Sequence, residues 1–91
     1  MSKPQHPPRS RIFVGGLLYS VSRRDLQQFF SAAGPVVEVF LAVDREDASR
    51  NRGFGFVQFP DADTAQKALE MFNNEPGPGG RRIGIKIANE D

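Results

Sequence analysis

The chain has 91 residues, a length typical of one domain. It contains no cysteine and one histidine, which excludes a disulfide framework and a thiolate metal site, so no metal and no cofactor is expected. The formal net charge of +1, from 12 basic and 11 acidic residues, does not by itself indicate a protein that binds nucleic acid.

The N-terminal segment, residues 1–10, is proline-rich and mildly basic. This composition predicts a disordered leader, and the segment lacks the apolar region of a secretory signal. No apolar run approaches the length of a membrane span, so no membrane partner is expected. The sequence predicts a folded domain over 11–88, followed by a polar C-terminal end at 89–91.

The first half of the domain predicts a strand, a helix and a second strand. Residues 11–15 are largely apolar and run into two glycines, which predicts a short strand. Ser22 precedes apolar residues at helical spacing and is the expected N-cap, while Gly34-Pro35 ends that helix. Residues 36–43 are rich in β-branched side chains and predict the next strand.

The second half repeats this pattern in the order strand, helix, strand. Residues 44–51 are polar and predict a loop, and 52–59 predict a strand that ends before a proline. Asp61 is the expected N-cap of a second helix, whose apolar residues again recur at helical spacing. A Pro- and Gly-rich loop over 73–80 leads to a last strand at 82–88 with alternating isoleucines.

The predicted order βαββαβ is that of a ferredoxin-like α+β sandwich. In this fold, a four-stranded antiparallel sheet carries two helices on one face. The other face of the sheet is open, so we expect the functional residues there.

The octamer at 52–59, Arg-Gly-Phe-Gly-Phe-Val-Gln-Phe, supplies the main functional signal. Alternate residues of a strand point to opposite faces of its sheet. Val57 and Phe59 therefore suit the core, and Phe54 and Phe56 lie on the other face with a cation. Paired aromatic rings beside a cation can stack the bases of a single-stranded nucleic acid.

The same parity argument, applied to all four strands, predicts the composition of the open face. Bases are expected to stack on aromatic rings, and cations and polar groups to contact phosphates and base edges. The predicted stacking residues are Phe13, Phe54 and Phe56, and the predicted contacts to phosphates or bases are Arg52, Arg11, Lys86 and Gln58. Phe40 is a possible additional stacking residue, although a bulge in its strand would reverse its direction and bury it.

Two segments of the chain resemble the conserved motifs of the RNA recognition motif. The octamer agrees with the family pattern K/R-G-F/Y-G/A-F-V-x-F/Y at every specified position. The segment Ile12-Phe13-Val14-Gly15-Gly16-Leu17 resembles the family's hexamer, and the resemblance extends from about Arg11 to Ala88. The sequences of the two motifs are most similar to those of hnRNP-type domains.

This resemblance implies a function and a role for individual residues. It implies stacking roles for Phe13, Phe54 and Phe56 and a phosphate contact for Arg52. It also implies binding of single-stranded RNA, or in some members single-stranded DNA, by a monomer in mRNA processing or post-transcriptional regulation. The expected location is the nucleus or the cytoplasm.

Two alternatives stay open at this stage. One is a protein-interaction module of the same fold that binds a peptide through its helical face or its sheet, although such modules usually lose the sheet aromatics. The other is an acyl phosphate hydrolase, which needs a phosphate-binding loop and a group that positions water. The loop after the first strand, Gly16 to Ser20, contains no cation, so no enzymatic activity is expected. Tyr19 in that loop is expected to pack on the start of the helix.

Overall fold

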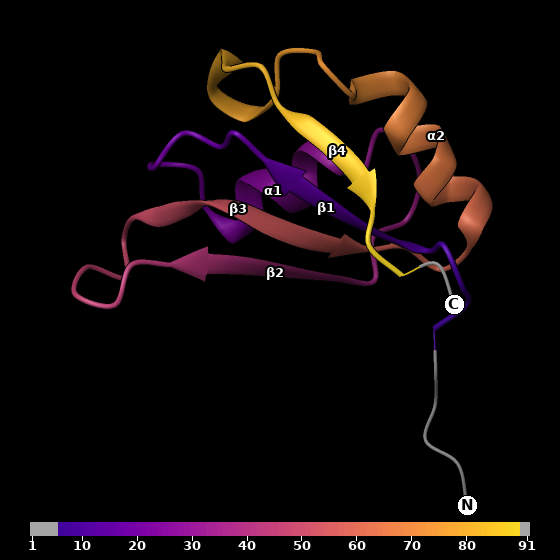
Figure 1. Cartoon of the computed structure of the whole chain (residues 1–91), viewed down its shortest axis with the longest axis horizontal. Coiled ribbons are helices and arrows are strands. Elements are labelled where there is room, and N and C mark those ends of the chain that lie inside the picture. Colours follow the sequence, from indigo (N-terminus) through magenta and orange to yellow (C-terminus); the bar gives the residue numbers. More distant parts are fainter. Residues whose placement is uncertain (1–5, 90–91) are drawn as a thin grey trace, which may run out of the picture.

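The computed structural model describes residues 6–89, and its strands and helices follow in the predicted order. They are β1 (Arg11–Gly15), α1 (Arg23–Phe30), β2 (Glu38–Val43), β3 (Asn51–Gln58), α2 (Ala62–Phe72), a short 3-10 turn η1 (Pro78–Gly80) and β4 (Gly84–Ile87). The strands form one antiparallel sheet in the order β2-β3-β1-β4, which confirms the ferredoxin-like fold. Figure 1 looks onto this sheet, with α1 behind it.

Both helices begin at the predicted side-chain caps. The Ser22 hydroxyl accepts a hydrogen bond from the Asp25 amide at 3.1 Å, and the Asp25 carboxylate accepts one from the Ser22 amide at 3.0 Å. The Asp61 carboxylate accepts hydrogen bonds from the Thr64 amide at 2.8 Å and the Thr64 hydroxyl at 2.7 Å. These two bonds lower the pKa of Asp61 below its usual value of 3.8. The caps satisfy first-turn amides that have no partner inside a helix.

The last strand is shorter than predicted. It begins at Gly84, because Arg82 pairs instead with Pro76 in an isolated bridge within the preceding connection. The Asn73 side chain then accepts a hydrogen bond from the Ile85 amide at 2.8 Å, which ties the end of α2 to β4.

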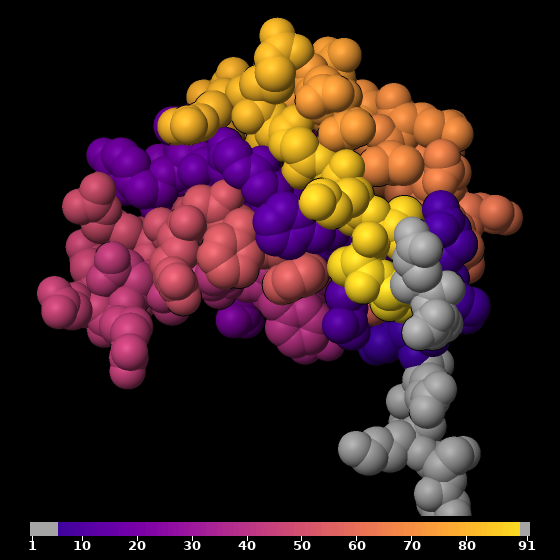
Figure 2. Space-filling view, in the orientation of Figure 1, coloured from indigo at the N-terminus to yellow at the C-terminus, as the bar shows by residue number. Residues whose placement is uncertain are grey.

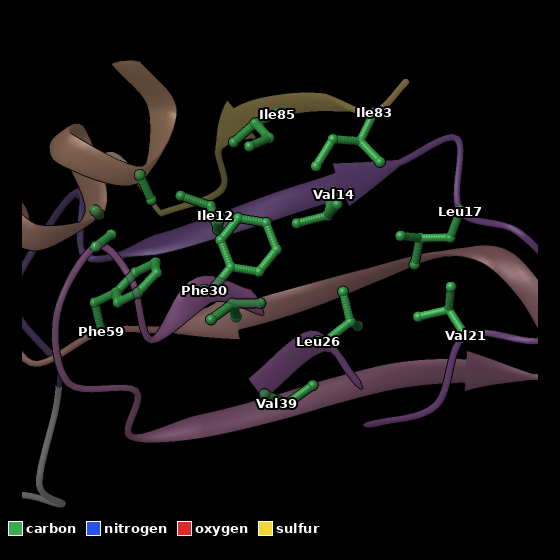
Figure 3. Close-up of a cluster of buried hydrophobic side chains, with 14 residues drawn as sticks. Ile12, Val14, Leu17, Val21, Leu26, Phe30, Val39, Phe59, Ile83 and Ile85 are labelled. Atoms are coloured by element: carbon green, nitrogen blue, oxygen red, sulfur yellow. The ribbon is translucent and has the colours of Figure 1, made fainter. Parts of the chain in front are cut away.

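The core lies between the sheet and the two helices, and Figure 3 shows Leu26 and Phe30 of α1 pointing toward the strands. The buried apolar side chains are Ile12, Val14, Leu17, Val21, Leu26, Phe30, Ala33, Val39, Val57, Phe59, Ala65, Ala68, Ile83 and Ile85. Burying one large apolar side chain stabilises the fold by roughly 1.5–3 kcal/mol. This gain fixes which face of each strand points inward, and therefore sends the alternate residues of every strand to the open face.

The pairing of β3 with β2 is irregular near the start of the octamer. The pairing passes from Leu41 opposite Gly55 to Val43 opposite Asn51, so a single β2 residue faces three residues of β3. Gly53 lies inside this irregular stretch with φ of 97°, a value that favours glycine.

The folded unit starts before Arg11, which corrects the predicted boundary between leader and domain after residue 10. Ser10 is fully buried, and its carbonyl accepts a hydrogen bond from the Phe59 amide at 2.9 Å. Asn89 fastens the same end of the molecule, because its side chain accepts a hydrogen bond from the Arg11 amide at 2.7 Å and donates one to the Pro7 carbonyl at 3.0 Å. The predicted leader residues 1–5 and the last two residues, 90–91, lie outside the described part of the chain.

Candidate nucleic-acid interface

One side chain from each strand forms a row across the middle of the open face. The strand register places Phe40 of β2 opposite Phe56 of β3, Phe56 opposite Phe13 of β1, and Phe13 opposite Lys86 of β4. Antiparallel partners lie close enough for their side chains to touch. Figure 2 shows this face, on which side chains of β1, β3 and β2 (indigo, red and magenta) meet near the centre.

The aromatic cluster, which we define as Phe13, Phe54 and Phe56, is continuous. The Phe13 and Phe54 rings are 5.9 Å apart between centroids and inclined by 27°, and the Phe13 and Phe56 rings are 5.6 Å apart and inclined by 67°. All three side chains are half-buried rather than covered by another layer. They therefore support one another at their edges and leave ring surface available to a ligand.

Two glycines leave the sheet surface beside this cluster without side chains. Gly15 is the register partner of both Phe54 and Gly84, so two neighbouring positions of that row carry no side chain. A Cβ atom on Gly15 would come within 3.1 Å of the Phe13 ring, whereas one on Gly84 would meet nothing within 4 Å. The face is consequently flat and open next to Phe13 and Phe54, as a stacked base requires.

Two of the predicted cations lie at the rim of the cluster. The Arg52 guanidinium is 5.7 Å from the centroid of the Phe54 ring, within the range of a cation–π interaction. Lys86 is exposed and lies beside Phe13 on the neighbouring strand. Both side chains can therefore bring positive charge to the backbone of a nucleic acid whose bases stack on the rings.

Phe40 points to the open face. Its side chain is 42% exposed, and the Arg11 guanidinium lies 5.5 Å from the centroid of its ring. The irregularity in the pairing begins after Leu41, so it does not reverse the direction of Phe40. Of the two alternatives that the sequence leaves open for this residue, the structure has the exposed one.

Gln58 does not lie where the sequence predicted. Its parity is that of the open face, but its side chain is 0% exposed. The amide nitrogen donates hydrogen bonds to the Ser10 hydroxyl at 2.7 Å and the Phe59 carbonyl at 2.8 Å, and the amide oxygen accepts one from Arg11 Nε at 2.9 Å. The prediction that Gln58 contacts a base directly is wrong, because the segment before β1 covers it and its amide is fully used.

The loop before α1 also differs from its prediction. Tyr19 is 57% exposed instead of packed on the helix, and the Arg50 guanidinium lies 4.3 Å from the centroid of its ring. The buried side chain of Asn51 holds this loop beside β3 through hydrogen bonds to the carbonyls of Leu18 at 2.6 Å and Val21 at 3.0 Å. No local sequence pattern predicts these contacts, because they join residues that are 33 and 30 positions apart in the chain.

The loop between β2 and β3 is closed by its own acidic side chains. The Asp44 carboxylate accepts hydrogen bonds from the amides of Glu46 at 2.8 Å and Asp47 at 3.2 Å. Asp47 in turn accepts hydrogen bonds from the hydroxyl and amide of Ser49, which lower the pKa of its carboxyl. These hydrogen bonds come from uncharged groups and shape the loop without removing the negative charge of the acids, which still offsets that of the loop arginines.

Two other kinds of site can be assessed over residues 6–89. Within that range, no group of three or more His, Cys, Asp or Glu residues is arranged to hold a metal ion. None of the helices described there is long and apolar enough to cross a membrane.

Comparison with known proteins agrees with this arrangement. Residues 12–83 match the sequence profile of the RNA recognition motif. The chain belongs to the RNA recognition motif family. This RRM is 46% identical over 79 residues to Small RNA-binding protein 11, chloroplastic, of Arabidopsis thaliana, covering 87% of the chain and 53% of that protein. It is 41% identical over 81 residues to Glycine-rich RNA-binding protein 5, mitochondrial, of the same plant, covering 89% of the chain and 27% of that protein.

Solved structures show the same fold. The crystal structure of RNA Binding Protein PG1 matches this RRM with a TM-score of 0.79 at 36% identity, covering 89% of this chain and 95% of that one. The Rna15 RRM with bound RNA (GU) matches with a TM-score of 0.80 at 22% identity, covering 92% and 88%. The chain therefore spans about half of the first curated relative and about a quarter of the second, but nearly the whole of both solved domains.

Proposed function

We propose that this RRM binds single-stranded RNA on the open face of its sheet, with bases stacked on Phe13, Phe54 and Phe56. The observation that carries the proposal is the continuous aromatic cluster on a sheet face that no described element covers. Each base stacked on an aromatic side chain contributes about 1–3 kcal/mol to binding. Arg52 and Lys86 add phosphate contacts at the rim of the cluster.

The names of the relatives support RNA as the ligand and widen the choice of compartment. Both curated relatives are named as RNA-binding proteins, one chloroplastic and one mitochondrial. We therefore propose a role in mRNA processing or post-transcriptional regulation. The proposed compartment is an organelle, the nucleus or the cytoplasm. Binding of single-stranded DNA, a monomeric state and a protein partner on the helical face stay predictions.

A double substitution tests the proposal. Phe54→Ala with Phe56→Ala removes two rings that make no contribution to the buried core, so the thermal melt should stay close to that of the wild type. Affinity for a short single-stranded RNA, measured by fluorescence anisotropy, should fall at least 30-fold, about the loss of one to two stacked bases.

The matched control is Met71→Ala, which truncates an apolar side chain on α2 that is 40% exposed and lies off the open face. It should leave RNA affinity unchanged. Wild-type affinity in the folded double variant would show that the aromatic cluster is not the binding surface.

A further inference from the structure

Arg11 is held in one position at the edge of the aromatic cluster. Its Nε donates a hydrogen bond to the Gln58 side-chain oxygen at 2.9 Å, and its guanidinium lies 5.5 Å from the centroid of the Phe40 ring. Arg11 starts on β1 and Phe40 belongs to β2, so the side chain reaches across β3 between them. An arginine that serves only as a mobile cation needs no such support.

The buried amide of Gln58 cannot turn without losing its other bonds. Its nitrogen donates to the Ser10 hydroxyl and the Phe59 carbonyl, so its oxygen must face Arg11. Gln58 thereby acts as a positioning residue for the guanidinium. Within residues 6–89 the two terminal nitrogens of Arg11 make no hydrogen bond, and they are available side by side to a ligand.

An acid lies on the same part of the open face. The register places Glu38 of β2 opposite Gln58, and its parity is that of Phe40 two residues later. Glu38 is exposed, and its carboxylate has no hydrogen-bond or ion-pair partner in the described part of the chain. A carboxylate repels phosphate, so its presence on an RNA-binding face favours a ligand that offers N–H donors.

We propose that Arg11 and Glu38, beside the rings of Phe40 and Phe56, form a subsite that selects guanine. This inference rests on the proposed RNA-binding function and adds a base preference to it. Guanine presents two acceptors, O6 and N7, that match the fork of an arginine, and its N1 and N2 donors can meet a carboxylate. No other RNA base offers two adjacent acceptors next to two adjacent donors, so guanine satisfies both side chains.

Single-stranded RNAs that differ at one base provide the experiment. The probes are a short uridine oligomer and the same oligomer with one guanine at each position in turn. The best guanine position is then replaced by 7-deazaguanine, which lacks N7, or by inosine, which lacks the N2 amino group. We expect the guanine oligomer to bind the wild type about tenfold more tightly than the uridine oligomer, and both analogues to lose most of that gain.

Two substitutions at exposed or half-buried positions assign the contacts. Arg11→Lys keeps the charge but loses the fork, and should abolish the penalty of 7-deazaguanine while retaining that of inosine. Glu38→Gln should abolish the penalty of inosine. Glu70→Gln, an equivalent change on the outer surface of α2, is the control and should alter neither penalty.

The positioning role of Gln58 has its own readout. Gln58→Leu should reduce the ratio of guanine to uridine affinity toward that of Arg11→Lys, and this ratio does not depend on the fraction of folded protein. An unchanged ratio in the variant would remove Gln58 from the proposal.

The outcomes separate this inference from the proposed function. Equal affinity for guanine and uridine oligomers, or an unchanged penalty of 7-deazaguanine in Arg11→Lys, would overturn the guanine subsite. RNA binding that depends on Phe54 and Phe56 would then still hold. Loss of the RNA-binding function itself would appear as failure to bind any of the oligomers.

Discussion

The structure requires glycine at the two glycine positions of the octamer for two different reasons. Gly53 supplies the positive φ of the bend in β3. Gly55 instead allows close approach of β2, because a Cβ atom there would lie 2.6 Å from the Phe40 carbonyl oxygen and 3.4 Å from the Leu41 Cα. The neighbour is a backbone, which cannot be identified from side-chain patterns.

Gly55→Ala should therefore destabilise the domain. The added methyl group meets the backbone of β2 at Phe40 and Leu41, and overpacking of this kind costs typically about 1–3 kcal/mol. Gly84→Ala is the matched control in the same sheet, since a Cβ there meets nothing within 4 Å. Urea denaturation should show a lower free energy of unfolding for the first variant and little change for the second. Equal values for the two would contradict the close approach of β2 at this position.

At the scale of single elements, the start of α2 depends on an ionised cap. The two hydrogen bonds from Thr64 lower the folded-state pKa of Asp61 below 3.8, its value in an unfolded chain. A depressed folded pKa means that the cap's contribution is fully present above the unfolded pKa and is lost as pH falls through the folded one.

Asp61→Asn tests this dependence. Asparagine is also a good N-cap but does not titrate in this range, so the variant should lack the part of acid destabilisation that arises from Asp61. Melting temperatures measured from neutral pH to below 3.8 should fall less steeply for the variant than for the wild type. Asp63→Asn, in the same turn but without a capping bond, is the control. Parallel curves for the wild type and Asp61→Asn would show that the cap carries no pH dependence.

The elements themselves were largely predictable because they depend on local periodicity. Alternation within β1 and β3 was enough to place Phe13, Phe54 and Phe56 on one face. The burial of Gln58 was not predictable in the same way, because alternation gives the direction of a side chain but not which residues cover it. Ser10 covers it through contacts 48 positions apart in the chain, and no pattern near either residue encodes them.

At the scale of the whole molecule, the net charge predicted the function least well. The net charge is +1, yet three cations gather on the open face: Arg11, Arg52 and Lys86. In the proposed binding mode only Arg52 and Lys86 contact phosphates, so stacking and hydrogen bonding should supply most of the affinity and the electrostatic part should be small. This division can be measured from the effect of salt, because only phosphate contacts release counterions.

The logarithm of the RNA association constant should fall with the logarithm of salt concentration with a shallow slope. Arg52 and Lys86 as phosphate contacts give a slope of about −1.4, at about −0.7 per contact for a single strand. Arg52→Gln and Lys86→Gln should each reduce its magnitude by about 0.7. Arg11→Gln should leave the slope unchanged, because Arg11 is assigned to a base, and Lys67→Gln on α2 is the control. A slope steeper than about −3 would mean that phosphate contacts beyond this face dominate, so that stacking on the aromatic cluster is the minor part of binding.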